Sequence, residues 1–170
     1  MQQPRVYIII LNYNNPKDTI ECLESIYHQL IYDNFHVVLL DNSSTDDSEC
    51  IFKNWQQENK PFNFTFIQTG ANKGFAGGNN IGILFAQKQG DMDYVWILNN
   101  DTVVVKDTLL ELVKKWNQIK ISDYVVLYYI IIIHLEYKPL VVYIIHGLLR
   151  RLIIQIYIIF PNGHIRSEPL

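Results

Sequence analysis

The chain has 170 residues, of which 49% are hydrophobic and 18% are charged, and its formal net charge is −3. This length suits one domain, or one domain with an appendage, because single domains usually run to about 100 to 200 residues. The apolar content is too high for a disordered chain. A slightly acidic chain also lacks the basic excess that binds phosphate backbones, so nucleic acid is not an expected partner.

The two cysteines, Cys22 and Cys50, form no metal-binding or disulfide pattern, and each falls in a predicted helix. We therefore expect two buried, reduced thiols. Met1 leads through QQPR directly into an apolar strand, without the apolar core and cleavage site of a signal peptide. These features predict a cytoplasmic protein.

Up to residue 118, short apolar runs alternate with amphipathic stretches. This pattern is typical of βαβ units around a mostly parallel sheet. We expect strands at 6–12, 36–41, 64–69 and 93–101, and helices that begin at Pro16 with Asn15 as its cap, after 43–49, within 70–82 and at Asp107. The apolar helix faces comprise Ile20, Leu23, Ile26, Tyr27 and Leu30, then Ile51, Phe52 and Trp55, then Ile81, Leu84 and Phe85, and finally Leu109, Leu112, Val113 and Trp116.

Polar residues follow each of the four predicted strands. In an open α/β sheet, ligands bind outside the carboxyl ends of the strands, which is where these residues fall. Turn chemistry alone explains any single cluster, because Asn, Asp, Ser and Gly favour turns through local hydrogen bonds. Four clusters in succession at one edge favour a ligand site. The clusters are Asn12–Asn14, Asp41–Ser44, Asn72–Asn80 and Asn99–Asp101.

The glycine-rich stretch is not a standard nucleotide motif. Gly74, Gly77 and Gly78 give G-x-x-G-G, which is neither GxGxxG nor a Walker motif, so the pattern disfavours dinucleotide-binding oxidoreductases and P-loop NTPases. Its backbone N–H groups and the following helix N-terminus can still approach an anion, and Lys73 adds positive charge.

Asp101 places a hard oxygen ligand at the end of the fourth predicted strand. Mg²⁺ or Mn²⁺ is commonly held by one or two carboxylates together with substrate phosphates, which suits this position. The alternative is that Asp101 caps the next turn.

Four motifs, in this order, resemble the family 2 glycosyltransferases: VYIIILNYNN, VVLLDNSSTDDS, GANKGFAGGNNIG and WILNNDTVV. The resemblance implies an inverting enzyme with the glycosyltransferase-A fold, a Rossmann-like α/β/α sandwich with a mostly parallel central sheet. It is strongest to the rhamnosyltransferase-type branch of bacterial polysaccharide synthesis, which includes cell-wall and O-antigen polymers. The resemblance spans Val6 to Trp116 and implies a nucleotide-sugar-binding domain over residues 1–118.

The resemblance further implies a UDP-sugar or dTDP-sugar donor. In the second polar cluster, Asp41 would accept a hydrogen bond from the N3–H of a uracil or thymine base. The implied substrate-binding residues are Asn12, Tyr13, Asn14, Asp41, Asn42, Ser43, Lys73, Gly74, Asn79, Asn99 and Asn100.

A divalent cation is implied as well, because Asn99–Asp101 stands where the family has its D-x-D motif. Asn99 replaces the first carboxylate, and Asp101 matches the metal-binding one. In inverting transfer, Mg²⁺ or Mn²⁺ and nearby N–H dipoles stabilise the charge that develops on the leaving diphosphate. A carboxylate must also take the proton of the attacking acceptor hydroxyl. The sequence identifies no residue for that catalytic role.

Residues 119–170 differ in character from the rest. They are dense in Ile, Tyr and Leu, and their carboxylates are Asp123, Glu136 and Glu168. The family's acceptor region follows this point and often carries an acidic Glu-Asp pair, which the segment lacks. Asp123 comes too soon after the sheet and Glu136 lies in an apolar setting, so neither suits the base. The segment is interpreted as additional strands or as an acceptor region altered by truncation or a frameshift.

The apolar runs 124–133 and 140–145 are too short to span a bilayer. Buried strands are favoured, with an adhesive surface or a peripheral membrane contact involving Arg150 and Arg151 as alternatives, because the family often acts on lipid-linked acceptors. Two functions stay open. One is a transferase that moves a sugar such as rhamnose to a saccharide or lipid-linked acceptor; the other is a donor-binding fragment or pseudoenzyme without a base.

Overall fold

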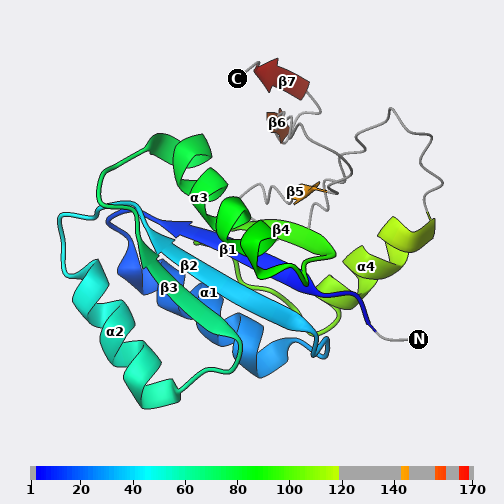
Figure 1. The fold of residues 1–170 in the computed structure, drawn as a ribbon, viewed down its shortest axis with the longest axis horizontal. Coiled ribbons are helices and arrows are strands. Elements are labelled where there is room, and N and C mark those ends of the chain that lie inside the picture. Colours follow the sequence, from blue (N-terminus) through cyan, green and yellow to red (C-terminus); the bar gives the residue numbers. More distant parts are fainter. Residues whose placement is uncertain (1–2, 119–142, 146–155, 160–164, 169–170) are drawn as a thin grey trace.

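The computed structural model describes residues 3–118, 143–145, 156–159 and 165–168. Strands and helices alternate along the first 118 residues, as the sequence predicts (Figure 1). The elements are β1 (Val6–Asn12), α1 (Pro16–Gln29), β2 (Phe35–Asp41), α2 (Ser48–Asn59), β3 (Phe64–Gln68), α3 (Gly74–Gln89), β4 (Tyr94–Asn99), α4 (Thr108–Gln118), β5 (Tyr143–Ile145), β6 (Ile156–Ile159) and β7 (Ile165–Glu168).

Strands β1 to β5 form one mostly parallel sheet in the order β3-β2-β1-β4-β5. β1 runs parallel to β2 and β4, β2 runs parallel to β3, and β5 pairs antiparallel with β4. β6 and β7 form a separate antiparallel pair. The chain order reverses between β1 and β4, and ligands of such sheets bind outside the carboxyl ends of the strands at that reversal.

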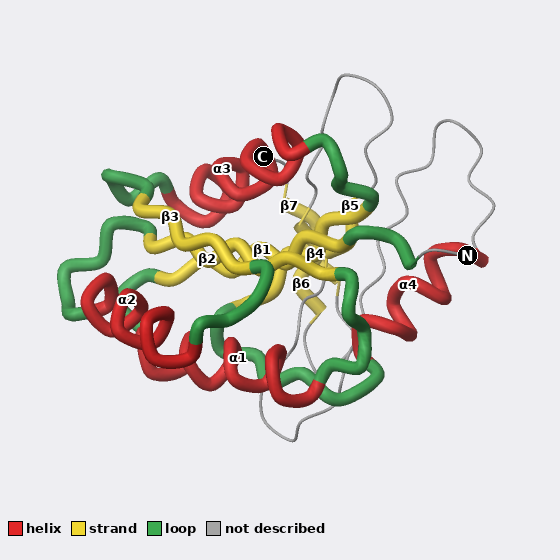
Figure 2. The backbone as a smooth tube through the Cα atoms, turned by 60° about the horizontal axis from the view of Figure 1, so that its bottom comes forward, coloured by secondary structure: helices red, strands yellow, loops and turns green. Residues whose placement is uncertain are grey.

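Helices cover both faces of the sheet, with α3 on one side and α1 and α2 on the other (Figure 2). Successive side chains of a strand point to opposite faces. Val6, Ile8 and Ile10 of β1 therefore pack in the cluster that includes α1, α2 and α4, whereas Tyr7 and Ile9 pack in the cluster with α3. Burial on both faces explains the unbroken apolar runs of the strands. The predicted α/β/α sandwich is confirmed.

The predicted apolar face of α3 is partly wrong. Leu84 is 54% exposed, while Ile83 and Ala86 are buried. The reason is close packing: a Cβ on Gly82 would lie 2.7 Å from Cγ2 of Ile9, so only a glycine lets the helix approach the strands this closely. The small residues therefore face the sheet, and this contact rotates Leu84 outward.

The two cysteines have different environments. Cys22 on α1 is buried, as predicted, but Cys50 on α2 is exposed, because Phe52 and Trp55 occupy the buried side of that helix. Both are free thiols. Burial raises the pKa of the Cys22 thiol to about 12.

We expect one thiol of the native chain to react with Ellman's reagent between pH 7 and pH 9. The thiolate is the reactive form, so Cys22, whose pKa is raised by burial to about 12, stays protonated and unreactive while Cys50 is modified. Chain unfolded in urea should titrate as two thiols. Equal reaction rates for both thiols in the native chain would contradict the burial of Cys22.

Part of the apolar C-terminal segment is described as strands. Tyr143–Ile145, within the predicted run 140–145, is the strand that pairs with β4. The run 124–133, the residues Asp123 and Glu136 and the pair Arg150 and Arg151 lie outside the described residues, as does the side chain of Trp116. None of the described helices is both long and apolar enough to cross a membrane.

Candidate functional site

The predicted polar clusters meet at the carboxyl edge of the sheet. In the strand register, Asn12 lies opposite Asp41, Leu11 lies opposite Asn99, and Asp41 lies opposite Gln68. The loops after β1, β2, β3 and β4 therefore begin side by side. This is the edge at which ligands bind to open α/β sheets.

The Asp41 carboxylate is the centre of this edge and is only 1% exposed. Its Oδ1 accepts hydrogen bonds from Nδ2 of Asn12 at 2.8 Å and from the hydroxyl of Ser44. Its Oδ2 accepts hydrogen bonds from the backbone N–H of Ser44 at 3.2 Å and from Nε2 of Gln68 at 2.8 Å. The carboxylate is thus held by donors from β1, from its own loop and from β3.

The loops after β1 and β2 fix each other's shape. Asn14 and Ser43 have φ angles of 51° and 62°, in the left-handed region that few non-glycine residues adopt. Asn14 is held there because its backbone N–H donates to the Ser44 hydroxyl at 2.9 Å and its Oδ1 accepts from the Thr45 N–H at 2.8 Å. Tyr13, the residue before Asn14, is 46% exposed at this edge.

Asn42 connects the β2 loop to the glycine-rich segment. Its Oδ1 accepts from the backbone N–H of Lys73 at 3.0 Å, and its Nδ2 donates to Oδ1 of Asn72 at 3.0 Å and to the carbonyl of Gly74 at 3.3 Å. Gly74 begins α3 with a φ of 67°, a conformation suited to glycine. The N-terminus of α3 and the exposed Lys73 therefore stand beside the Asp41 loop.

Asn79 occupies a different position from the other predicted residues of this segment. It is 1% exposed, its Nδ2 donates to the Phe75 carbonyl at 2.9 Å, and its Oδ1 has no protein partner. It therefore lies within the packing of α3, whereas Lys73 and Gly74 lie on the open side of the helix start.

The end of β4 is joined to β1 through a residue that the sequence analysis missed. Nδ2 of Asn100 donates to Oγ1 of Thr19 at 2.9 Å, and the Thr19 hydroxyl is 2.9 Å from Oδ1 of Asn12 and 2.8 Å from the Asn15 carbonyl. Together with the bond from Asn12 to Asp41, this forms a continuous chain of hydrogen bonds across the edge. The signal was present in the sequence, because Thr19 shares a helical face with the buried Leu23 and Ile26.

Asn15 also differs from expectation in one respect. It stands at the start of α1, but its side chain makes no capping bond; Nδ2 donates instead to Oδ2 of Asp18 at 3.0 Å. Its carbonyl accepts from the N–H of Thr19 at 3.3 Å. Asn15 therefore supports the position of Thr19 through its backbone.

Replacing Thr19 by valine is expected to lower the free energy of unfolding by about 1 to 3 kcal/mol, because Asn12 and Asn100 each lose a buried partner. Thr19→Ser keeps the hydroxyl and should lose less. Urea unfolding of both variants measures the difference. Equal stability of the valine variant and the unchanged chain would show that the hydroxyl does not join the two strands.

Asp101 is exposed at the end of β4, next to the buried Thr102. Among the described residues, no group of three His, Cys, Asp or Glu side chains could hold a metal ion. A single carboxylate can nevertheless fit Mg²⁺ or Mn²⁺, because these ions take only one or two protein carboxylates when substrate phosphates complete their coordination. Asn99 and Asn100 directly precede Asp101 in the chain and carry two further amide oxygens.

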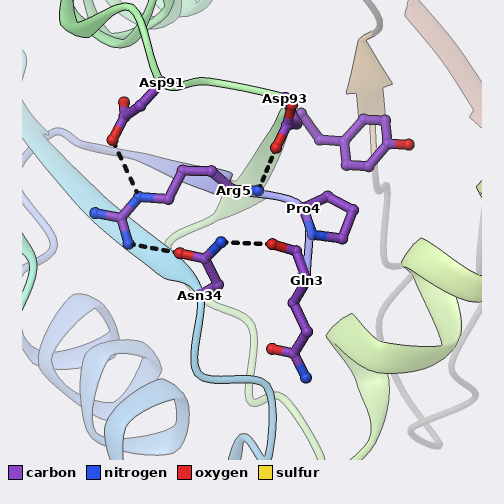
Figure 3. A pocket seen from close by; sticks show the side chains of 7 residues that line it. Gln3, Pro4, Arg5, Asn34, Asp91 and Asp93 are labelled. Carbon is purple, nitrogen blue, oxygen red and sulfur yellow. Dashed lines mark hydrogen bonds and ion pairs between the residues drawn. The ribbon is translucent and has the colours of Figure 1, made fainter. Parts of the chain in front are cut away.

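A hollow of about 590 Å³ lies at the opposite edge of the sheet (Figure 3). The Arg5 guanidinium there donates to Oδ1 of Asn34 at 3.1 Å and its Nε lies 3.6 Å from Oδ2 of Asp91, while its backbone N–H donates to Asp93 at 2.7 Å. These contacts join the amino ends of β1, β2 and β4. The hollow is lined by Gln3, Pro4, Arg5, Asn34, Asp91, Asp93 and Tyr94 and contains none of the predicted site residues.

Comparison with known proteins places the chain in a family. The family model described as glycosyl transferase family 2 matches residues 7–165, which extends beyond the four motifs into the C-terminal segment. The chain is 30% identical to the glycosyltransferase GlyG of Streptococcus pneumoniae over 122 residues, covering 71% of this chain and 38% of GlyG. It is 30% identical to the low-salt glycan biosynthesis hexosyltransferase Agl10 of Haloferax volcanii over 105 residues, covering 62% of this chain and 30% of Agl10.

Solved structures show the same architecture. The mannosyltransferase PcManGT of Pyrobaculum calidifontis, in complex with GDP-Man and Mn²⁺, is 26% identical with a TM-score of 0.57, over 67% of this chain and 32% of that one. Residues 1–349 of TarS from S. aureus, in complex with UDP, are 25% identical with a TM-score of 0.54, over 67% of this chain and 32% of that one. The chain thus spans about a third of the length of these relatives. It belongs to glycosyl transferase family 2 and has the mostly parallel α/β sheet of the glycosyltransferase-A fold.

Proposed function

We propose that the carboxyl edge of the sheet binds a nucleoside-diphosphate sugar and that the chain acts in an inverting transfer of that sugar. The observation that carries this proposal is the convergence, at one edge, of the buried Asp41, the start of α3 beside Lys73 and the exposed Asp101. Support also comes from neighbours of the same fold, one in complex with GDP-Man and Mn²⁺ and another with UDP.

In this proposal the β1 and β2 loops hold the nucleoside. Asp41 would recognise an N–H of the base, as in UDP or dTDP, and the exposed Tyr13 ring would lie against it. The two loops would keep their shape when the nucleotide binds, because hydrogen bonds and left-handed backbone angles already fix them. The residues that hold this shape are Asn12, Asn14, Asn42 and Ser43.

The α3 start and the β4 end would hold the diphosphate. The Lys73 side chain and the N-terminal end of the α3 dipole would supply positive potential for an anion. Asn99 and Asn100 would line the sugar side of the site, and the buried Asn79 would support the first turns of α3 from within its packing. Asp101 would hold Mg²⁺ or Mn²⁺, which supplies positive charge to the leaving diphosphate when bound.

The transfer itself needs groups beyond this edge. An acceptor hydroxyl oxygen would bond to the anomeric carbon as the bond from that carbon to the diphosphate breaks, and the hydroxyl proton would pass to a carboxylate. Asp123 and Glu136 lie outside the described residues, so the base stays unassigned. We propose that the acceptor is a saccharide or a lipid-linked molecule and that the transferred sugar is a hexose or rhamnose. The chain would then act in polysaccharide synthesis. If the acceptor is lipid-linked, the chain would also contact the membrane surface.

Donor binding and transfer are tested separately, because the chain spans only about a third of its relatives. Calorimetric titration of the full chain with UDP, dTDP and GDP, each with and without Mn²⁺, tests the first. We expect binding that strengthens with Mn²⁺. A folded chain that binds none of them would contradict the proposal. Donor binding without sugar transfer to any acceptor would instead favour a donor-binding fragment or pseudoenzyme.

A further inference from the structure

We propose that the Gln68 side chain occupies, in the nucleotide-free chain, the position on Asp41 that the base N–H must take, and that it thereby sets the affinity for the base. This inference rests on the proposed function, in which Asp41 recognises the base. It concerns a residue that the sequence motifs do not include, because Gln68 is the last residue of β3 and precedes the glycine-rich segment.

The Asp41 carboxylate has a limited number of acceptor positions. An ionised carboxylate has about four lone-pair positions on its two oxygens. Nδ2 of Asn12 and the Ser44 hydroxyl fill two of them on Oδ1. The Ser44 backbone N–H and Nε2 of Gln68 fill two more on Oδ2. A base N–H can therefore bind Asp41 only if one of these donors leaves.

The donors to Asp41 differ in how many other hydrogen bonds would be lost if each were displaced. Asn12 is fully buried and its Oδ1 is already bonded to Thr19. The two Ser44 donors are a backbone N–H and a hydroxyl that is also bonded to Asn12 and to the N–H of Asn14. Displacing any of these would break the loop structure of the site.

Gln68 differs from the other donors both in its exposure and in its freedom to move. It is exposed, and it stands on β3, the edge strand of the sheet. Its Nε2 also donates to Oε2 of Glu49 at 3.1 Å. An amide nitrogen has two hydrogens, so a side-chain rotation can release Asp41 while the bond to Glu49 is kept. Gln68 is therefore the donor that a base would replace.

The consequence is a competition that can be measured. A base N–H gains its bond to Asp41 only by breaking the Gln68 bond, so Gln68 lowers the affinity for any base that donates to Asp41. Removing the amide should tighten UDP binding by about fivefold, since water replaces the lost donor only in part. CDP should gain less than UDP, because N3 of cytosine carries no hydrogen and its ring cannot form the bond to Asp41 that N3–H of uracil forms.

Gln68→Met keeps the side-chain length but removes the amide. Gln68→Ala also removes the amide, without adding apolar surface. Gln57→Met, at an exposed position on α2, is the matched control. Calorimetric titration of the full chain with UDP, CDP and inorganic pyrophosphate in the presence of Mn²⁺ is the measurement. We expect both Gln68 variants to bind UDP about fivefold more tightly, with pyrophosphate affinity unchanged and Gln57→Met indistinguishable from the original chain.

The outcomes separate this inference from the proposed function. If the original chain binds UDP and both Gln68 variants bind it equally or more weakly, the inference is wrong while the donor site stands. If tightening extends to pyrophosphate, which has no base, Gln68 does not act through base recognition and the inference is also overturned. If the original chain binds no UDP, the proposed function fails and the inference fails with it.

Discussion

Asp101→Asn is expected to weaken Mn²⁺-dependent binding of UDP by about 100-fold or more while leaving the fold intact. The variant loses the carboxylate proposed to hold the ion. Loss of a residue that merely hydrogen-bonds to a metal ligand already lowers metal affinity by about 10- to 100-fold, so loss of the ligand itself should cost at least as much. Asp101 is exposed and asparagine has the same size, so the free energy of unfolding should change by no more than about 1 kcal/mol. Titration with UDP in Mn²⁺ and in EDTA measures the effect.

Asp33→Asn is the control for that variant. It makes the same change at an exposed carboxylate, but Asp33 precedes β2 and so stands at the opposite edge of the sheet. Its UDP affinity and metal dependence should match those of the unchanged chain. An Asp101→Asn variant that keeps its Mn²⁺ dependence would place the metal elsewhere.

Asp41→Ala should have the largest effect on stability among the site variants. Asp41 is buried and accepts hydrogen bonds from three different residues, and unpaired buried donors cost about 1 to 3 kcal/mol each. These costs are not additive, so we expect a loss of about 3 kcal/mol in the free energy of unfolding, or about 6 to 12 °C in Tm. The variant should also bind UDP more weakly while its affinity for pyrophosphate stays unchanged, because pyrophosphate has no base.

Asp46→Ala provides the comparison within the same loop. Asp46 is exposed, and its only hydrogen-bond donor among the described residues is Ser48 at the start of α2, so its loss should cost about 1 kcal/mol or less. Base preference should be unaffected. An Asp41→Ala variant no less stable than Asp46→Ala would mean that the bonds to Asp41 do not hold the three loops together.

Most of the fold could be predicted because local pattern and tertiary structure agree. The strand predicted at 6–12 is β1, with the same bounds, since both faces of an inner parallel strand are apolar and polar residues follow it. The rule that ligands bind beyond the carboxyl ends then placed Asp41 and Asp101 at one edge without any structure. Each of those predictions depends only on residues close together in sequence.

The features that could not be predicted depend on contacts between distant segments. The outward turn of Leu84 follows from how closely Gly82 approaches Ile9, which periodicity within α3 does not contain. The role of Thr19 depends on the end of β4 reaching α1. The full occupancy of the Asp41 oxygens likewise needs Gln68, which comes 27 residues later in the chain.

The central claim is that the carboxyl edge of the sheet holds the nucleotide and its metal, and paramagnetic broadening by Mn²⁺ in the presence of UDP tests it most directly. Mn²⁺ broadens the amide resonances of residues near it, and diamagnetic Mg²⁺ serves as the control. We predict loss of the resonances of Asn99, Asn100 and Asp101, with those of Asp91 and Asp93 unchanged. Broadening centred instead on Asp91 and Asp93, beside the hollow at the opposite edge, would contradict the account.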